Sequence, residues 1–129
     1  MMMNNKITLV TNNPLLLNSD QPFDIVEEED CIKVIAKCRD LIHQGAKLVT
    51  HPLAGSIKPW ETPFRSVLLD CNHTELDMSA LEMIESATQM YQHQLKGVTV
   101  PVLTEQSLTD YQVIDKELMN SAVKSLYIV

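Results

Sequence analysis

The chain has 129 residues, of which 45% are hydrophobic, and a formal net charge of -7. This length predicts a single domain over 1–129 that buries enough surface to fold without disulfides or a metal. The acidic balance disfavours nucleic acid as a partner, because phosphate binding needs clustered basic residues, and the apolar runs are too short to cross a membrane.

The N-terminal segment is expected to lead into a strand. Residues 1–5 lack the layout of a signal peptide and are predicted to be a disordered or extended lead-in. The β-branched run 7–11 predicts the first strand, which the turn residues 12–14 end. Weak alternation over 23–27 predicts a second strand at an edge of the sheet.

A helix and two strands are predicted in the middle of the chain. Apolar residues recur every three or four positions from Cys31, which is typical of an amphipathic helix. Asp30 is expected to cap its N-terminus and Gly45 its C-terminus. The runs 46–50 and 66–71 predict two further strands.

The C-terminal part is predicted to be mainly helical. One helix is expected over 79–96, with a capping box formed by Ser79 and Glu82. The segment 98–103 contains a proline and is at best an edge strand. A last helix is expected over 108–127, with its apolar residues on one stripe.

Strands that alternate with helices predict a three-layer α/β domain, with a mainly parallel sheet of four or five strands flanked by helices. Such sheets bind ligands beyond the carboxyl ends of their strands. The strands 7–11 and 46–50 end in similar turn residues. As parallel neighbours they would bring the loops 11–14 and 50–65 to one rim, where we expect the functional site.

The connection 50–66 is the most informative stretch of the chain. It holds the only tryptophan and three of the six prolines. Long loops in compact domains are usually functional or disordered, and the large apolar residues here argue against disorder. Trp60 is therefore interpreted either as part of a binding surface or as an anchor that pins the loop.

The segment 55–58 of the loop resembles an anion-binding cradle. A glycine allows backbone N–H groups to approach a ligand, a hydroxyl donates, and Lys58 supplies charge. The alternative is that Lys58 and Arg65 are solvated or pair with Glu61 and Asp70. Combined with asparagines on the same rim, the cradle predicts a carboxylate or phosphate site. The expected ligand-binding residues are Asn12, Asn13, His51, Gly55, Ser56, Lys58, Trp60 and Arg65.

His51, Ser56 and Glu61 offer the groups of an acyl-transfer triad, which needs a nucleophile, a base and a residue that orients the base. Only their closeness in the sequence supports this interpretation, since the chain lacks a G-x-S-x-G elbow. The alternative is that His51, which precedes a proline in a turn, hydrogen-bonds the loop backbone.

No cofactor or metal is expected. Cys71 and His73 offer two ligands, whereas a structural zinc site takes four. The three cysteines are an odd number, and Cys31 and Cys38 lie too far apart on one helix to form a disulfide. We therefore expect a reducing, cytoplasmic setting.

Three segments resemble the GrdX family: 9–14, 38–45 and 48–69, the last containing Thr-His-Pro-Leu-Ala-Gly-Ser-Ile-Lys-Pro. The resemblance covers about 7–71 by motif and the rest by length and layout. These small proteins are encoded in gene clusters for glycine, sarcosine or betaine reductase of amino-acid-fermenting anaerobes. The resemblance implies an accessory component and supplies no defined catalytic residue.

Three functions are considered. The first is an accessory or binding protein, whose rim takes a small anionic ligand or a component of the reductase. The second is a small enzyme acting on a carboxylate or phosphate ester, with His51 as general base and Glu61 orienting it. The third is a structural homodimer that supports assembly, with the loop 50–66 as its interface. Separately, the methionine and leucine stripe of the last two helices is interpreted either as core or as a dimer face.

Overall fold

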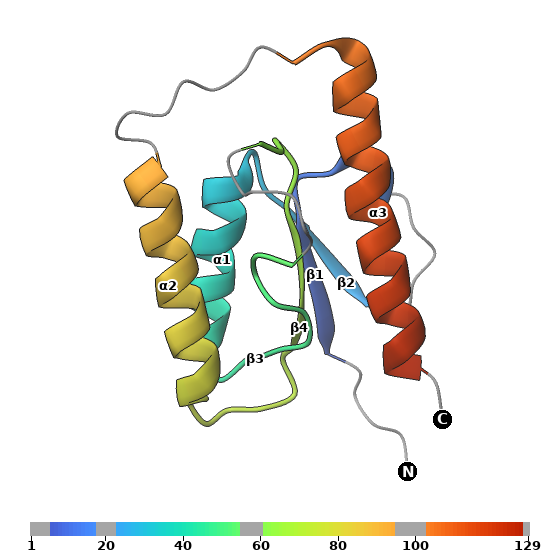
Figure 1. Cartoon of the computed structure of the whole chain (residues 1–129). Helices are drawn as coiled ribbons and strands as arrows, with labels where there is room; N and C mark the ends of the chain where they lie inside the picture. The colour runs from blue at the N-terminus through green and yellow to red at the C-terminus, as the bar shows by residue number, and fades with distance from the viewer. Residues whose placement is uncertain (1–5, 18–22, 55–60, 95–102, 128–129) are drawn as a thin grey trace.

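A computed structural model describes residues 6–17, 23–54, 61–94 and 103–127 (Figure 1). These residues form an α/β structure, as expected. The lead-in 1–5 lies outside them, and so does the predicted strand 98–103 except for its last residue. The elements in chain order are β1 (Ile7–Thr11), a short 3-10 helix η1 (Pro14–Leu16), β2 (Asp24–Glu27), α1 (Cys31–His43), β3 (Lys47–Leu48), β4 (Ser66–Asp70), α2 (Met78–Gln94) and α3 (Glu105–Tyr127).

The four described strands form one mixed sheet in the order β2-β1-β4-β3. β1 pairs with β2 in parallel, whereas β4 runs antiparallel to both β1 and β3. The prediction of a mainly parallel sheet is therefore wrong. The physical reason lies in the connections between strands. α1 connects β2 to β3, whereas the sequence predicts no helix between β3 and β4. A strand that returns to the sheet without a helical crossover pairs antiparallel with its neighbour.

The strands β1 and β3 are not neighbours, contrary to the prediction, because β4 lies between them. Both are antiparallel to β4, so they run in the same direction and end at the same side of the sheet. The register pairs Thr11 at the end of β1 with Ser66 at the start of β4. The chain that follows β1 therefore meets the chain that enters β4.

The helices cover both faces of the sheet, with α1 and α2 on one side and α3 on the other (Figure 1). Because side chains alternate along a strand, Val67 and Leu69 of β4 pack with α1 and α2, whereas Leu68 packs with α3. α2 packs mainly on α1 rather than directly on the sheet. The arrangement is thus less regular than the expected layers of helices flanking a sheet.

Both predicted ends of α1 are confirmed. The Asp30 carboxylate accepts a hydrogen bond from the Lys33 N–H at 2.8 Å. At the other end, Gly45 has φ +111° and donates to the Ile42 carbonyl, while Ala46 donates to the Leu41 carbonyl, which is a Schellman motif. The helix ends there because a left-handed residue cannot continue it.

The starts of the other two helices differ from the prediction. Asp77, rather than Ser79, caps α2, since its carboxylate accepts from the N–H groups of Ser79 and Ala80. α3 begins earlier than expected, because the Thr104 hydroxyl accepts from the Ser107 N–H at 3.1 Å. No helix in the described part of the chain is both long enough and apolar enough to cross a membrane.

Candidate functional site

Asn12 joins the segment after β1 to the end of the long loop before β4. Its side-chain amide donates to the Pro63 carbonyl at 2.7 Å, and its oxygen accepts from the Arg65 N–H at 2.7 Å. The backbone N–H of Asn12 also donates to the Arg65 carbonyl at 3.4 Å. The loops 11–14 and 50–65 therefore meet, but through β4 and not through the pairing of β1 with β3 that we expected.

A closed ring of hydrogen bonds lies on the face of the sheet that α3 covers. The Asn13 N–H donates to the Thr11 hydroxyl at 2.9 Å, and that hydroxyl lies 2.6 Å from the Ser66 hydroxyl. Ser66 donates to the Asp115 carboxylate at 2.5 Å, and the Asn13 side chain donates to the same oxygen at 3.0 Å. All four residues are buried. Such a network holds its side chains in one conformation, because burying any one of these polar groups without its hydrogen-bond partners would be energetically unfavourable.

Asp115 and Ser66 are site residues that the sequence interpretation missed. A signal for Asp115 was present, because it lies four residues after Tyr111 and three before Leu118, which belong to the apolar stripe predicted for this helix. A charge on an otherwise apolar stripe is rarely buried without polar partners. Asn13, in contrast, was predicted, and its amide also donates to the Gln112 carbonyl at 2.8 Å.

Arg65 is buried on the opposite face of the sheet, with 4% of its surface exposed. Its Nε donates to the Tyr91 hydroxyl at 3.1 Å, and its Nη1 donates to the Ala54 carbonyl at 3.1 Å. Both acceptors are neutral. Among the residues that the structure describes, no carboxylate oxygen lies within 4.0 Å of the guanidinium, and both N–H groups of Nη2 have no partner.

The guanidinium lies near the N-terminus of α1, where Cys31 is the first residue. Burial raises the pKa of the Cys31 thiol to about 11, although the charge of Arg65 acts in the opposite direction. Burial likewise raises the pKa of Tyr91 to about 12, again against the charge of Arg65. Both groups therefore stay protonated at neutral pH, and Arg65 carries the positive charge among these three side chains.

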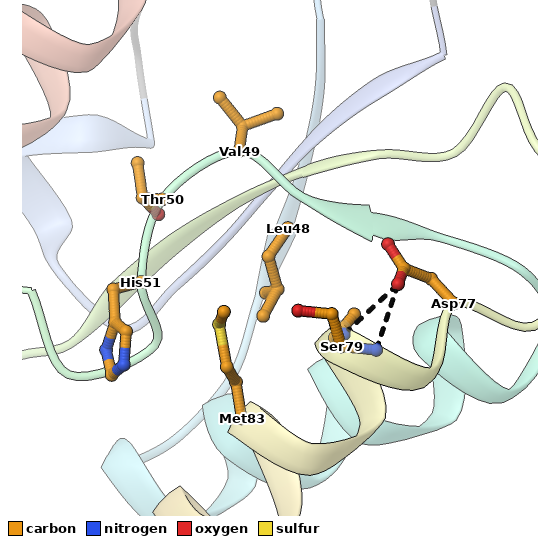
Figure 2. Close-up of a pocket in the computed structure, with 8 residues that line it drawn as sticks. Leu48, Val49, Thr50, His51, Asp77, Ser79 and Met83 are labelled. Atoms are coloured by element: carbon orange, nitrogen blue, oxygen red, sulfur yellow. Dashed lines mark hydrogen bonds between the residues drawn. The ribbon is translucent and has the colours of Figure 1, made fainter.

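His51 lies apart from this cluster, on the turn after β3. It lines a pocket of about 240 Å³. Figure 2 shows its side chain across from Ser79 and Met83 of α2. The Leu53 N–H donates to His51 Nδ1 at 3.0 Å, so the proton of the neutral ring is on Nε2. This bond is the backbone contact that we considered as the alternative to catalysis.

The other predicted site residues contribute little to the described geometry. Gly55, Ser56, Lys58 and Trp60 lie outside the described residues. Glu61 is half-buried, and among the described side chains no hydrogen bond joins it to His51. The described residues likewise contain no group of three or more His, Cys, Asp or Glu side chains placed to hold a metal ion.

The described residues thus form two polar clusters at one end of the sheet. The cluster around Asp115 is closed by its own hydrogen bonds. The cluster of Arg65, Tyr91 and Cys31 combines a buried cation with a helix N-terminus, and both features favour a negative charge. The Asp30 carboxylate already caps that N-terminus, so the charge of Arg65 is the feature that would attract a small anion.

The comparisons with known proteins agree with the motifs found in the sequence. A family model described as GrdX-like protein matches residues 8–124. Searches of curated proteins and of solved structures each find no match. Because the family model matches nearly the whole chain, the protein belongs to the GrdX-like family.

Proposed function

We propose that this protein is an accessory protein of the glycine, sarcosine or betaine reductase system and binds a small anionic ligand at Arg65. Membership of the GrdX-like family supports the association with a reductase. The observation that carries the binding role is the buried guanidinium, whose hydrogen-bond acceptors among the described residues are neutral. Burying a charge is costly unless an opposite charge compensates it, and a bound anion would supply that charge.

Thermal unfolding with small anions tests this proposal. Sodium acetate, butyrate, sulfate and phosphate are compared at constant ionic strength, because a ligand that binds only the folded state raises the unfolding temperature. We expect at least one anion to raise the Tm of the wild type by several degrees at saturation. We expect Arg65→Gln to abolish the rise, since it removes the charge.

Arg39→Gln is the matched control. Arg39 and Arg65 are the two arginines of the chain, and Arg39 is exposed and already pairs with Glu85. Arg65→Lys provides a second test if Arg65→Gln does not fold, because it keeps the charge but loses the planar fork and should weaken binding. The proposal fails if no anion raises the wild-type Tm, or if the Arg65 variants respond like the wild type.

The role of partners is a separate part of the proposal. Exposed methionines along α2 support a homodimer or a surface for a reductase component, with 58% of Met78 and 39% each of Met83 and Met90 exposed. Sedimentation of the wild type and of Met83→Lys checks the dimer, and a monomeric wild type would contradict it. Three cysteines without disulfides support a reducing, cytoplasmic setting.

A further inference from the structure

The pocket of about 240 Å³ that His51 lines lies between the turn after β3 and the N-terminal end of α2. Hydrogen bonds hold both of its walls in place. On one side, the N–H groups of Val49 and Thr50 donate to the Leu68 carbonyl at 2.9 and 3.2 Å, and the Thr50 hydroxyl accepts from the Leu68 N–H at 3.0 Å. On the other side, Asp77 caps α2. The pocket is therefore formed before any ligand enters it.

Three polar groups of this pocket have hydrogen-bonding capacity that the described residues leave unused. The Leu53 N–H occupies His51 Nδ1, so Nε2 carries the proton of the neutral ring and can donate it to a ligand. Oδ1 of Asp77 accepts from the N–H groups of Ser79 and Ala80, whereas Oδ2 accepts from no described group. The hydroxyl of Ser79, which also lines the pocket, bonds to no described residue.

These groups are spread along the pocket and have apolar surface between them. Figure 2 shows His51 at one side and Asp77 at the other, with Ser79 and Met83 between them. Met83 leaves 39% of its surface exposed, and Leu48 adds a second apolar side chain to the lining. The pocket therefore matches a ligand with a polar group at each end and an aliphatic middle, which would cover apolar surface that now faces water.

The charge of the pocket favours a cation. Among the described residues that line it there is no lysine or arginine, and Asp77 is its carboxylate. The N-terminus of α2 would attract an anion, but its N–H groups at Ser79 and Ala80 already bond to Asp77. The formal net charge of -7 adds a negative potential around the whole chain. A positive group beside Asp77 Oδ2 would gain from each of these features, whereas a second carboxylate would be repelled.

We infer that this pocket binds a small linear primary ammonium ion that carries a hydrogen-bond acceptor at its other end. The ammonium group donates to Asp77 Oδ2, the aliphatic middle lies on Leu48 and Met83, and the acceptor receives the proton of His51 Nε2. The site is separate from Arg65 and prefers the opposite charge. The inference therefore goes beyond the proposed function, and each of the two is decided by its own titration.

NMR of the histidine rings of the full-length protein at neutral pH tests the inference, because the chain has four histidines. The probes are linear aminobutanol, butanediol and sodium hydroxybutyrate, which share a terminal hydroxyl and a chain of four carbons. Their other ends are an ammonium, a hydroxyl and a carboxylate. At constant pH and ionic strength, aminobutanol should shift the His51 signal saturably and leave those of His43 and His93 in place. It should bind about two- to fivefold more tightly than butanediol, as expected for a partly exposed ion pair, and hydroxybutyrate should bind most weakly.

Asp77→Asn isolates the charge, because asparagine caps a helix as well as aspartate does. We expect this variant to bind aminobutanol and butanediol equally. Asp30→Asn is the matched control, since Asp30 caps α1 in the same way and does not line the pocket. His51→Phe keeps a ring but removes both nitrogens, so it should weaken aminobutanol and butanediol by a similar factor, followed at the Met83 methyl signal.

The affinities of the wild type decide the inference even if Asp77→Asn does not fold. Butanediol that binds as tightly as aminobutanol, or hydroxybutyrate that binds most tightly, would show that the ammonium class is wrong. A His51 signal that moves with none of the three probes would show that the pocket does not bind such ligands. Loss of the preference for aminobutanol in Asp30→Asn as well as in Asp77→Asn would show that the preference does not come from Asp77.

Discussion

Arg65 and Ser66 are consecutive residues whose side chains enter opposite faces of the sheet. Arg65 donates to Tyr91 of α2, and Ser66 donates to Asp115 of α3. The alternation of a strand makes this possible, since neighbouring side chains point to opposite sides. One short segment therefore fixes a helix on each face of the sheet at the same end.

The ring around Asp115 should be coupled energetically. We expect Ser66→Ala and Asp115→Asn each to lower the free energy of unfolding by about 1–3 kcal/mol, because each leaves a buried polar partner without its hydrogen bond. The double variant should lose less than the sum, by at least about 0.5 kcal/mol. Urea unfolding of the two single variants and the double variant measures this coupling.

Asp110→Asn is the control for that cycle, since Asp110 is exposed on the same helix and should change stability by less than about 0.5 kcal/mol. Strict additivity of Ser66→Ala and Asp115→Asn would show that the two side chains stabilise the fold independently.

Gly45→Ala should be strongly destabilising. The residue has φ +111°, and an added Cβ would lie 2.6 Å from the carbonyl oxygen of His73 and from the backbone of Thr74. The left-handed strain alone costs about 1 kcal/mol, and the clash with backbone adds to it. We expect a loss of at least about 2 kcal/mol by urea unfolding. The neighbouring exposed substitution Gln44→Ala should cost far less, and equal losses would refute the account of this turn.

The buried thiol of Cys31 predicts how stability changes at alkaline pH. Its pKa is raised from 9.0 to about 11 in the folded protein, so above pH 9 the unfolded chain releases this proton first. Stability should therefore fall as pH rises from 9 to 11, by up to about 1.4 kcal/mol per pH unit for this group.

Cys38 is also buried and its pKa is also raised, so it contributes to the same fall. Cys31→Ala should retain the part due to Cys38 and lose the part due to Cys31. Urea unfolding at pH 8, 9, 10 and 11 measures both slopes. Identical slopes for the wild type and Cys31→Ala would contradict the burial of this thiol.

Local patterns in the sequence predicted the elements well, because the signals that start and end a helix lie within a few residues of it. Examples are the apolar periodicity of α1 and its capping residues Asp30 and Gly45. The order of the strands could not be predicted in this way. It depends on the return of the chain into β4 between β1 and β3, which no short pattern encodes.

The site was predicted only in part for the same reason. Asn12, Asn13 and Arg65 were identified from loop composition, and Asn12 does join the two predicted segments. The partners of Arg65 and Ser66 come from α2 and α3, at separations of 26 and 49 residues. Burial of Arg65 is equally invisible in the sequence, since arginine is usually exposed.

NMR of the arginine Nε–H groups tests the central claim most directly, because the chain has only two arginines. The Nε–H of Arg65 is buried and hydrogen-bonded, whereas Arg39 is exposed and serves as an internal reference. During titrations with sodium acetate, butyrate, sulfate and phosphate at constant ionic strength, we predict a saturable shift of the Arg65 signal with at least one anion and little change at Arg39. An Arg65 signal that stays in place with all four anions, or a shift confined to Arg39, would contradict the claim that Arg65 holds the ligand.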